Sequence, residues 1–408
     1  MKVLRFSHDY LVNTGGLMGH LRALNRALAG TGRVEVLQTF LVGESQMEAL
    51  EAAGKVRRRD GHWYEARTPI RVFPCLVPMR TPGRTDMDSD TACTAFRRHL
   101  DGLLRRERPH LLHVHLVRHR IQVVALEAAG AAGTPAVITH HEGRPATPKM
   151  AEILRESCRL ADRVCAVTRF SAAAFGGPRV DYRGFFVDRD FWNPGAVANR
   201  DRDAWRRRLA PGATDRLMVY PARFIPRKNH EFLIRGLHRV VRSRAVRDAG
   251  LGVRLALPGP TLPEGLPFKS RLEKLVSNLD LDGHVTFLET LSPADLRALY
   301  SAAQIVVYPA RNEGAGRSHL EGMLLGCCPA VSGDGGLVEY VRHRVNGIVF
   351  SPNHVDDLVR GLESILLSDD LRRSLAAAAR ETAAGLTLDR YASDHLTLYR
   401  RLMDEKRA

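Results

Sequence analysis

The sequence predicts an α/β protein built from two doubly wound units, each with a parallel sheet. Short apolar runs of strand length alternate with segments of helical periodicity, and this alternation occurs twice along the 408 residues. Runs that are apolar throughout are typical of strands buried on both faces of a parallel sheet. A polar stretch with Pro and Gly, Phe191–Pro211, separates the two series, and we interpret it as the interdomain connection.

In the first half, the expected strands are Val3–Phe6, Val34–Leu41, Leu111–Val114, Ala136–Thr139, Arg163–Val167 and a weak one near Val180–Arg183. The expected helices there are Met18–Leu28, Thr91–Arg106, Ile121–Ala131 and Lys149–Leu160. Together they predict a first domain over residues 1–192.

In the second half, the expected strands are Leu217–Pro221, Val253–Leu257, Val285–Leu288, Ile305–Tyr308, Pro329–Ser332 and Gly347–Phe350. The expected helices are His230–Ser243, Pro267–Leu279, Ser292–Ala302, Ser318–Leu325, Leu337–Val341 and Val355–Leu366. This predicts a second domain over residues 193–386. A last helix, Leu388–Glu405, follows a break at Gly385, and we expect the segment 387–408 to pack back on the first domain.

The composition is that of a globular protein in a reducing compartment. Apolar residues make up 44% and charged residues 26% of the chain. No apolar run approaches the ~20 residues of a membrane-spanning helix, and the N-terminus turns polar too soon for a secretory signal. The six cysteines have neither metal-ligand nor disulfide spacing. We therefore expect a cytoplasmic protein.

The net charge of +16 raises the question of nucleic-acid binding. Only seven of the 61 basic residues are lysines, which suggests an arginine-rich coding composition as much as a binding role. The arginines scatter through amphipathic helices without interleaved aromatic residues. We interpret them as a solvated face, which could still steer an anionic ligand or touch a membrane surface.

Two glutamates, Glu313 and Glu321, stand in a glycine-bearing loop and in the helix expected after it. The amides at a helix start are unpaired and carry the positive end of the helix dipole, so a diphosphate can dock there. Eight helical residues rise ~12 Å, about the span of a sugar diphosphate from hexose to ribose. Glu313 could then accept hydrogen bonds from the hexose and Glu321 from the ribose. Two solvated glutamates are the alternative.

A second candidate motif, Leu217–Asn229, places two cations after a strand. Arg223 and Lys228 follow the strand end at Pro221 and precede the His230 helix. Such a pair can clamp a diphosphate and neutralise the leaving group as a glycosidic bond breaks. Ordinary surface charge is the alternative.

Two further signals are weaker. Asn13, Thr14, Gly15 and Gly16 form a loop in which paired glycines would allow close backbone approach to a phosphate or hexose, or simply a tight turn. Four histidines follow two successive strands of the first domain. A metal site is conceivable for them, but polar residues lining a cleft are the better interpretation, with His141 donating to a sugar hydroxyl. The histidines are His113, His115, His140 and His141.

Together these segments resemble the retaining glycosyltransferase family 4, which has the GT-B fold. The resemblance extends along nearly the whole chain and is best over 213–352. Its motifs are the Gly15-Gly16 loop, Pro109–His115, His141, Ala161–Thr168, Ala222–Asn229 with Arg223 and Lys228, the E-x7-E pair Glu313 and Glu321, Gly326–Val331 and Asn346–Ile348.

The resemblance implies two Rossmann-like domains facing across a cleft, with the donor held mainly by the second. It also implies transfer with retention, by a front-face displacement and without a required metal or cofactor. On this view Arg223, Lys228, Glu313 and His141 are catalytic. The donor would be bound by Gly15, Gly16, Leu288, Gly314, Ala315, Gly316, Arg317, Ser318 and Glu321.

Departures from the family pattern leave the substrates open. Ala315, Arg317 and Ser318 replace common residues of the loop that reads the hexose, and Glu289 stands where a glycine often lies beside the base. Asn229 also replaces a common glycine. A UDP-sugar is the preferred donor over a GDP-sugar.

The acceptor would lie in loops of the first domain, near Trp63–Tyr64, in 74–90 and in 141–149. The candidate acceptor residues are Asn13, Asp86, His115 and Glu142. Asp86, with Asp88 and Asp90, could attract a cationic aminocyclitol, or could simply be solvated.

The function expected is transfer of a hexose or N-acetylhexosamine from a nucleotide sugar to a hydroxyl of a small glycoside, aminocyclitol or lipid-linked acceptor. Such a monomer or homodimer would have at most peripheral membrane contact and no nucleic-acid partner. A nucleotide-sugar epimerase of the same fold is the first alternative. A non-catalytic nucleotide- or RNA-binding protein is the second.

Overall fold

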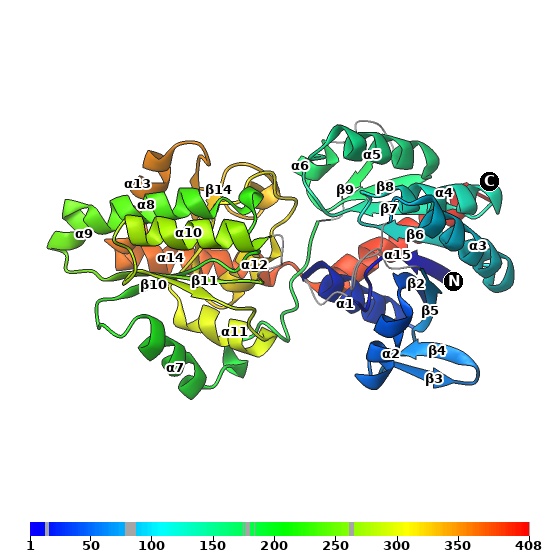
Figure 1. Ribbon diagram of the computed structural model, residues 1–408, viewed down its shortest axis with the longest axis horizontal. Helices are drawn as coiled ribbons and strands as arrows, with labels where there is room; N and C mark the ends of the chain where they lie inside the picture. The colour runs from blue at the N-terminus through cyan, green and yellow to red at the C-terminus, as the bar shows by residue number, and fades with distance from the viewer. Residues whose placement is uncertain are drawn as a thin grey trace. The chain divides into compact units, whose positions relative to one another are not determined.

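A computed structural model describes residues 1–12, 16–77, 87–173, 175, 180–182, 184–260 and 265–407. The chain divides into two units, one made of Met1–Phe185 with Leu388–Ala408 and the other of Phe186–Thr387 (Figure 1). The chain leaves the first unit at Phe185, ahead of the boundary expected at 192, and returns to it at Leu388.

The first unit has a nine-stranded sheet of order β3-β4-β5-β2-β1-β6-β7-β8-β9. Neighbouring strands run parallel from β5 through β2 and β1 to β9, while β3, β4 and β5 pair antiparallel at one edge. The strands are β1 Lys2–Phe6, β2 Glu35–Val42, β3 Val56–Arg59, β4 His62–Glu65, β5 Arg71–Leu76, β6 Leu111–His115, β7 Ala136–His140, β8 Arg163–Ala166 and β9 Val180–Tyr182.

Helices cover both faces of this sheet (Figure 1). Successive strand residues point to opposite faces, and the ring of Phe6 stacks on Phe96 of α3 with centroids 4.4 Å apart. On the other face, strand residues Val137 and Cys165 pack against Leu398 and Leu402 of α15. The helices are α1 Gly16–Gly30, α2 Glu44–Ala52, α3 Asp90–Glu107, α4 Arg120–Ala131, α5 Pro148–Leu160, α6 Arg169–Ala172 and α15 Leu388–Glu405.

The second unit has a six-stranded, wholly parallel sheet of order β12-β11-β10-β13-β14-β15. Its strands are β10 Arg216–Val219, β11 Val253–Pro258, β12 Val285–Leu288, β13 Ile305–Tyr308, β14 Cys328–Ser332 and β15 Ile348–Phe350. Its helices are α7 Asn199–Leu209, α8 His230–Arg242, α9 Arg244–Asp248, α10 Leu266–Asn278, α11 Pro293–Ala302, α12 Arg317–Leu324, α13 Val355–Leu366 and α14 Asp369–Ala384, with 3-10 turns η1 Pro194–Ala196, η2 Pro226–Lys228 and η4 Gly336–Glu339.

The order of this second sheet matters for the site. Strands β10 and β13 are neighbours although almost ninety residues separate them in the chain, and Met218 pairs with Ile305. Because neighbouring parallel strands end at the same edge of a sheet, the loops after β10 and β13 lie side by side.

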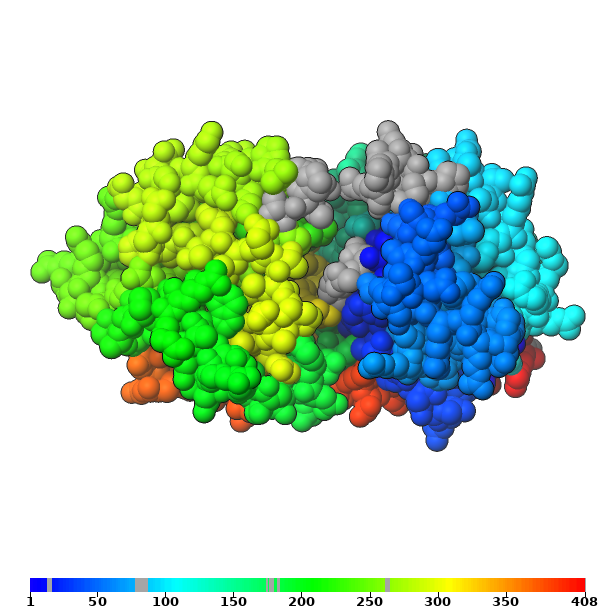
Figure 2. All heavy atoms as spheres, turned by 60° about the horizontal axis from the view of Figure 1, so that its bottom comes forward, coloured from blue at the N-terminus to red at the C-terminus, as the bar shows by residue number. Residues whose placement is uncertain are grey.

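Several elements differ from the sequence-based expectations. The segment 191–211 is not an open connection, because it contains α7, which packs on α11 within the second unit. Figure 2 shows the green and yellow atoms of these two segments next to one another. The β3–β4 hairpin, α2, β5 and α14 were not expected. The helix α14 is rich in alanine and buries only Leu375, Ala379 and Ala383, so its apolar stripe is narrow. The helix expected at 337–341 is the 3-10 turn η4.

Within the described ranges, no helix is long and apolar enough to cross a membrane. All six cysteines are free thiols, and five of them are buried.

Candidate active site

Lys228 is the buried cation of the second unit. It ends the 3-10 turn η2 in the loop after β10, and only 9% of its side chain is exposed. Its Nζ donates to the Tyr308 hydroxyl at 2.8 Å and to Glu313 Oε2 at 2.7 Å. An ammonium group has three N–H donors. Among the described residues only these two acceptors meet them, so one N–H remains available.

Glu313 lies in the loop after β13 and faces this cation. Its Oε2 also accepts from Arg227 Nη1 at 2.9 Å, and its side chain is 15% exposed. Burial raises the pKa of Glu313, but the charges of Lys228 and Arg227, aided by Arg223, outweigh it and hold the pKa below its ordinary value. The other oxygen, Oε1, accepts no hydrogen bond from any described residue. The carboxylate is therefore ionised and retains one oxygen for a ligand.

The two family positions Arg223 and Lys228 differ in burial. Arg223 is exposed in the loop after β10, and its charge reaches Glu313. Asn229, which replaces a common glycine, has φ +56° and ends η2 in the left-handed region. Asn tolerates this conformation better than most residues. The replacement therefore keeps the turn that presents Lys228.

The position of the Glu313 loop depends on two glycines. Gly335 has φ +126°, and a Cβ there would lie 2.5 Å from the Glu313 carbonyl oxygen. Gly316 has φ +64°, and its Cβ would meet Leu337 at 2.4 Å. The amide of Gly336 donates to the Glu313 carbonyl at 2.9 Å. The close approach of these two loops therefore requires residues without side chains.

The helix α12 begins directly after this loop. Gly316 is its N-cap residue, and within the described part of the chain no side chain caps the helix start. Ala315 is buried, and the Ser318 carbonyl accepts from the Tyr300 hydroxyl at 2.7 Å. Gly314 and Arg317 flank the loop.

Leu288 is buried at the end of β12 on the far side of the same sheet, where its carbonyl accepts from the Gly259 amide.

Glu321 is buried one turn into α12 and pairs with Arg317, whose Nε lies 2.6 Å from Glu321 Oε1. The geometry of this ion pair falls short of a hydrogen bond. Burial raises the pKa of Glu321 above its ordinary value, and the Arg317 charge offsets this only in part. Glu313 and Glu321 thus have opposite environments, because among the described residues Glu313 forms ion pairs with two cations and Glu321 with one.

Three residues of this site were not singled out from the sequence. Arg227 precedes Lys228 in the sequence, and this adjacency was the only indication that Arg227 could belong to the site. Tyr308 accepts from Lys228 at the end of β13, and His319 is buried in α12, where its Nδ1 bonds to the Gly316 carbonyl. Burial lowers the pKa of His319 to about 4, so the ring is neutral. A carbonyl can only accept, so Nδ1 carries the proton.

In the first unit, the candidate residues gather after β6 and β7. The Nδ1 of His115 lies 3.2 Å from His141 Nε2, and Glu142 pairs with Arg118 at 3.2 Å. Burial lowers the pKa of His141 to about 3. His113, next along β6, bonds to Tyr399 of α15 at 2.6 Å.

Two of the three acidic residues proposed to attract a cationic acceptor are already paired. Asp88 accepts from the Arg120 amide at 2.7 Å and from Lys149 at 3.0 Å, and Asp90 pairs with the Arg120 side chain. Asp88 and Asp90 are therefore neutralised within the chain. Trp63 and Tyr64, expected in a loop, lie in strand β4, where the Arg58 guanidinium covers the Trp63 ring at 5.1 Å.

Some candidates lie outside the described residues, namely Asn13, Gly15 and Asp86. Gly16 is described as the first residue of α1. Among the described residues, no group of three or more His, Cys, Asp and Glu side chains could hold a metal ion.

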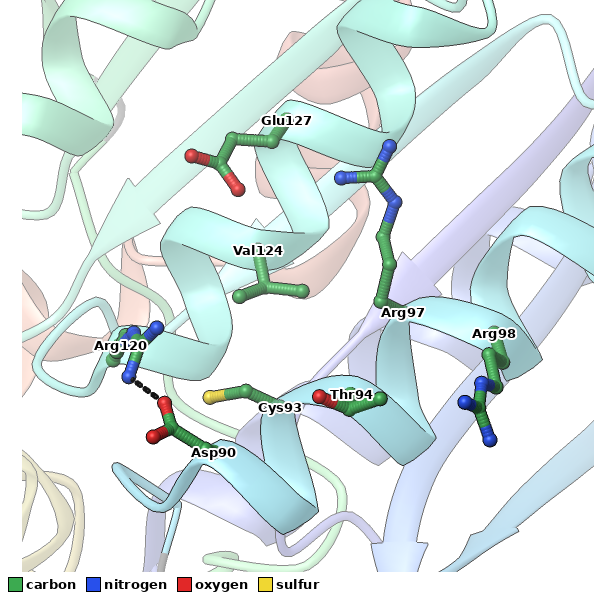
Figure 3. A pocket seen from close by; sticks show the side chains of 8 residues that line it. All are labelled: Asp90, Cys93, Thr94, Arg97, Arg98, Arg120, Val124 and Glu127. Atoms are coloured by element: carbon green, nitrogen blue, oxygen red, sulfur yellow. Dashed lines mark hydrogen bonds and ion pairs between the residues drawn. The ribbon is translucent and has the colours of Figure 1, made fainter.

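A hollow of about 350 Å³ lies between α3 and α4 of the first unit (Figure 3). Eight side chains line it, among them the ion pair of Asp90 with Arg120. None of the candidate catalytic or donor-binding residues is among them, so this hollow is separate from the candidate site.

Comparison with known proteins agrees with this geometry. Residues 201–382 match the family model "Glycosyl transferases group 1", and residues 15–183 match "Glycosyl transferase 4-like domain". The chain belongs to the group 1 glycosyltransferases of family 4.

Curated relatives are named D-inositol 3-phosphate glycosyltransferase. The Salinispora arenicola protein is 32% identical over 197 residues, which are 48% of this chain and 43% of that protein. The Nocardia farcinica protein is 26% identical over 292 residues, 70% of this chain and 60% of that protein. The chain spans about half the length of the curated relatives it matches.

Solved structures share the fold along the whole chain. Sucrose-phosphate synthase from Thermosynechococcus elongatus has a TM-score of 0.79 at 18% identity, covering 99% of both chains. The Anabaena protein HepE, solved with UDP-glucose, has a TM-score of 0.72 at 20% identity and covers 97% of this chain and 99% of its own. The fold is that of the GT-B glycosyltransferases, as expected.

Proposed function

We propose that this protein transfers a hexose or N-acetylhexosamine, with retention, from a nucleotide sugar to a hydroxyl of a small acceptor. A UDP-sugar is the preferred donor, and no metal is required. The observation that carries the proposal is the cluster of Lys228, Arg227 and Glu313 beside the uncapped start of α12.

The donor diphosphate would bind between Lys228 and the start of α12. Lys228 keeps one N–H after its bonds to Tyr308 and Glu313, and a phosphate oxygen is a strong acceptor for a charged donor. The amides at the helix start and the helix dipole favour the same anion. The exposed Arg223 lies close enough for its charge to reach Glu313 and could contact the second phosphate.

The two glutamates would fix the ends of the donor. Glu313 Oε1 has no donor within the described residues, so it can accept from hexose hydroxyls while Oε2 remains paired. Glu321 would accept from the ribose hydroxyls. Among the described residues its one ion-pair partner is Arg317, and their contact leaves Glu321 Oε1 without a hydrogen bond, so ribose hydroxyls would add hydrogen bonds to this carboxylate.

In the reaction, the bond between the anomeric carbon and the diphosphate oxygen breaks, and its electron pair leaves with the nucleotide. The acceptor oxygen attacks from the same face, and its proton passes to the departing phosphate oxygen. Arg223 and Lys228 would stabilise the charge that develops on that phosphate. Glu313 would orient the hexose, and His141 would donate to one of its hydroxyls.

For the acceptor, we propose a hydroxyl of a cyclitol phosphate or a related small glycoside. The curated relatives, which are D-inositol 3-phosphate glycosyltransferases, support a phosphorylated cyclitol. The pairing of Lys149 and Arg120 with Asp88 and Asp90 favours this phosphorylated acceptor over a cationic aminocyclitol. A nucleotide-sugar epimerase is the competing function, and it would convert its donor without any acceptor.

A thermal-shift screen of nucleotides and nucleotide sugars tests the donor. A ligand that binds the folded state raises the melting temperature by mass action. We expect UDP and a UDP-sugar to raise it more than GDP and GDP-sugars. No shift with any nucleotide would contradict the proposed donor site.

Turnover of the variants tests the chemistry. Lys228→Ala and Arg223→Ala should each reduce kcat by about 100-fold or more, as loss of one charge-stabilising donor does. Arg235→Ala is the control, because Arg235 pairs with Glu231 on the exposed surface of α8. Product formed from donor alone would indicate an epimerase instead.

A further inference from the structure

Arg5 is a buried cation in the first unit for which the described residues provide no anion. It stands in the central strand β1 with none of its surface exposed, and its Nε and Nη1 have no hydrogen-bond partner among the residues that the structure describes. Its one contact is from Nη2 to His115 Nε2. A buried, unpaired cation is costly, and an apolar side chain in a central strand would avoid that cost. The arginine therefore calls for a reason other than stability.

The contact with His115 has a fixed direction. A guanidinium group can only donate hydrogen bonds, so Nε2 of His115 must accept. Burial, with further contributions from Arg5 and the neighbouring histidines, lowers the pKa of His115 well below its ordinary value, so the ring is neutral. A neutral imidazole carries one proton, which must then be on Nδ1.

The same reasoning shows which ring nitrogen of His141 carries the proton. The His115 Nδ1–H lies 3.2 Å from His141 Nε2 and donates to it. Because Nε2 of His141 accepts, the single proton of that neutral ring is on Nδ1. This Nδ1 has no hydrogen-bond partner among the described residues. The chain of bonds ends in a donor without an acceptor.

The three residues come from neighbouring strands, which makes the arrangement rigid. Arg5 lies within β1, His115 is the last residue of β6, and His141 directly follows β7. His113 does not compete for His115, although their rings are 4.0 Å apart. Its nitrogens are bonded to the Tyr399 hydroxyl at 2.6 Å and to Thr139 Oγ1 at 2.7 Å.

We propose that Arg5, acting through His115, fixes His141 in the tautomer whose Nδ1–H donates a hydrogen bond to the transferred sugar. Arg5 and His115 are then positioning residues. The role of the sugar rests on the proposed function, whereas the tautomer does not. Without Arg5, His115 could carry its proton on either nitrogen, and the hydrogen bond to His141 would lose its direction.

The tautomer can be observed directly by NMR of protein labelled with 15N-histidine. The nitrogen shifts and couplings of a neutral ring tell which nitrogen carries the proton, and comparison with His141→Gln identifies the His141 signals. We expect the Nδ1–H form in the unaltered protein. Arg5→Met and His115→Leu should give a mixture with the Nε2–H form. His115→Asn should keep the Nδ1–H form, because its amide can still donate toward His141.

A matched control is Arg71→Met. Arg71 is also a strand arginine of the first sheet, but it pairs with Glu35 at 2.6 Å and Glu107 at 2.9 Å. Its loss should lower the unfolding midpoint and leave the His141 tautomer unchanged. The Nε2–H form in the unaltered protein, or an unchanged Nδ1–H form in both Arg5→Met and His115→Leu, would overturn the proposal.

Kinetics and stability of the same variants separate positioning from structure. Arg5→Met should reduce kcat by about 10-fold and the control Arg71→Met should not, while the unfolding midpoint of Arg5→Met stays equal or rises. A midpoint that falls together with kcat in Arg5→Met would assign Arg5 a structural role and contradict the proposal. Absence of glycosyl transfer in the unaltered protein would count against the proposed function alone, because the NMR result does not depend on turnover.

Discussion

The ion pair of Lys228 and Glu313 should be energetically coupled far more strongly than a surface pair. Its charged atoms are 2.7 Å apart, and at an effective dielectric constant of about 20 two such charges attract by ~6 kcal/mol. Desolvation cancels part of this, and breaking one side of a buried pair typically costs ~3–5 kcal/mol. Arg227 continues to neutralise Glu313 from 2.9 Å, so we expect the lower end, about 3 kcal/mol, for Lys228→Met.

The coupling is measured by a double-mutant cycle of Lys228→Met and Glu313→Gln. Urea unfolding of the second unit can be followed by Trp192 and Trp205 in a Trp63→Phe background, which leaves no tryptophan in the first unit. We expect a coupling free energy of ~1–3 kcal/mol. The slope of the unfolding free energy against urea concentration should be the same in all four proteins of the cycle.

The control cycle uses Arg242 and Asp280 of the second unit, which are 3.1 Å apart with side chains 57% and 84% exposed. Exposed pairs contribute ~0–1 kcal/mol. The reasoning would be refuted if both cycles gave the same coupling, or if the Lys228–Glu313 coupling were below about 0.5 kcal/mol. Either result would mean that the two charges are solvated independently, contrary to their burial.

Three further results are expected. Glu321→Ala should weaken UDP binding by ~1–3 kcal/mol, because a charged acceptor for the ribose is lost; equal affinity by calorimetry would remove that role. Gly335→Ala should lower both stability and donor affinity, because a Cβ would lie 2.5 Å from a backbone oxygen, whereas Gly333→Ala, with its nearest atom at 3.5 Å, should do neither. Burial lowers the pKa of His230 to about 3 and of His319 to about 4, so below pH ~6.5 the unfolded chain binds protons that the folded protein does not. Stability should therefore fall as the pH is lowered from 6.5 toward 4, by up to ~1.4 kcal/mol per pH unit for each histidine; an unfolding midpoint constant over that range would contradict the burial of these rings.

The sequence predicted the fold class and nearly all parallel strands, because their apolar runs are continuous and separated by periodic helices. It did not predict the β3–β4 hairpin. The segments VRRR and HWYE are polar and short, and their pairing at the sheet edge depends on the turn at Asp60–Gly61 more than on burial. The helix α14 was missed because small alanines give a weak hydrophobic period.

For the site, spacing predicted that Glu313 and Glu321 belong to one loop and helix. It could not predict that Lys228 bonds to Glu313, since that contact depends on β10 and β13 being neighbours in the sheet. Tyr308 was missed for the same reason. Arg5 carried no signal at all, because a charged residue in the middle of an apolar strand is normally expected to reach solvent.

The return of α15 to the first unit makes that unit discontinuous in sequence, with the whole second unit inserted between its parts. During synthesis on the ribosome, the Tyr399 hydroxyl that bonds to His113 emerges only after every residue of the second unit has been translated. Until then, the apolar part of the sheet face that α15 covers, around Val137 and Cys165, stays open to solvent. We expect the inserted unit to reach its folded state earlier, and chains that stop shortly before Leu388 to be recognised by chaperones through that open face.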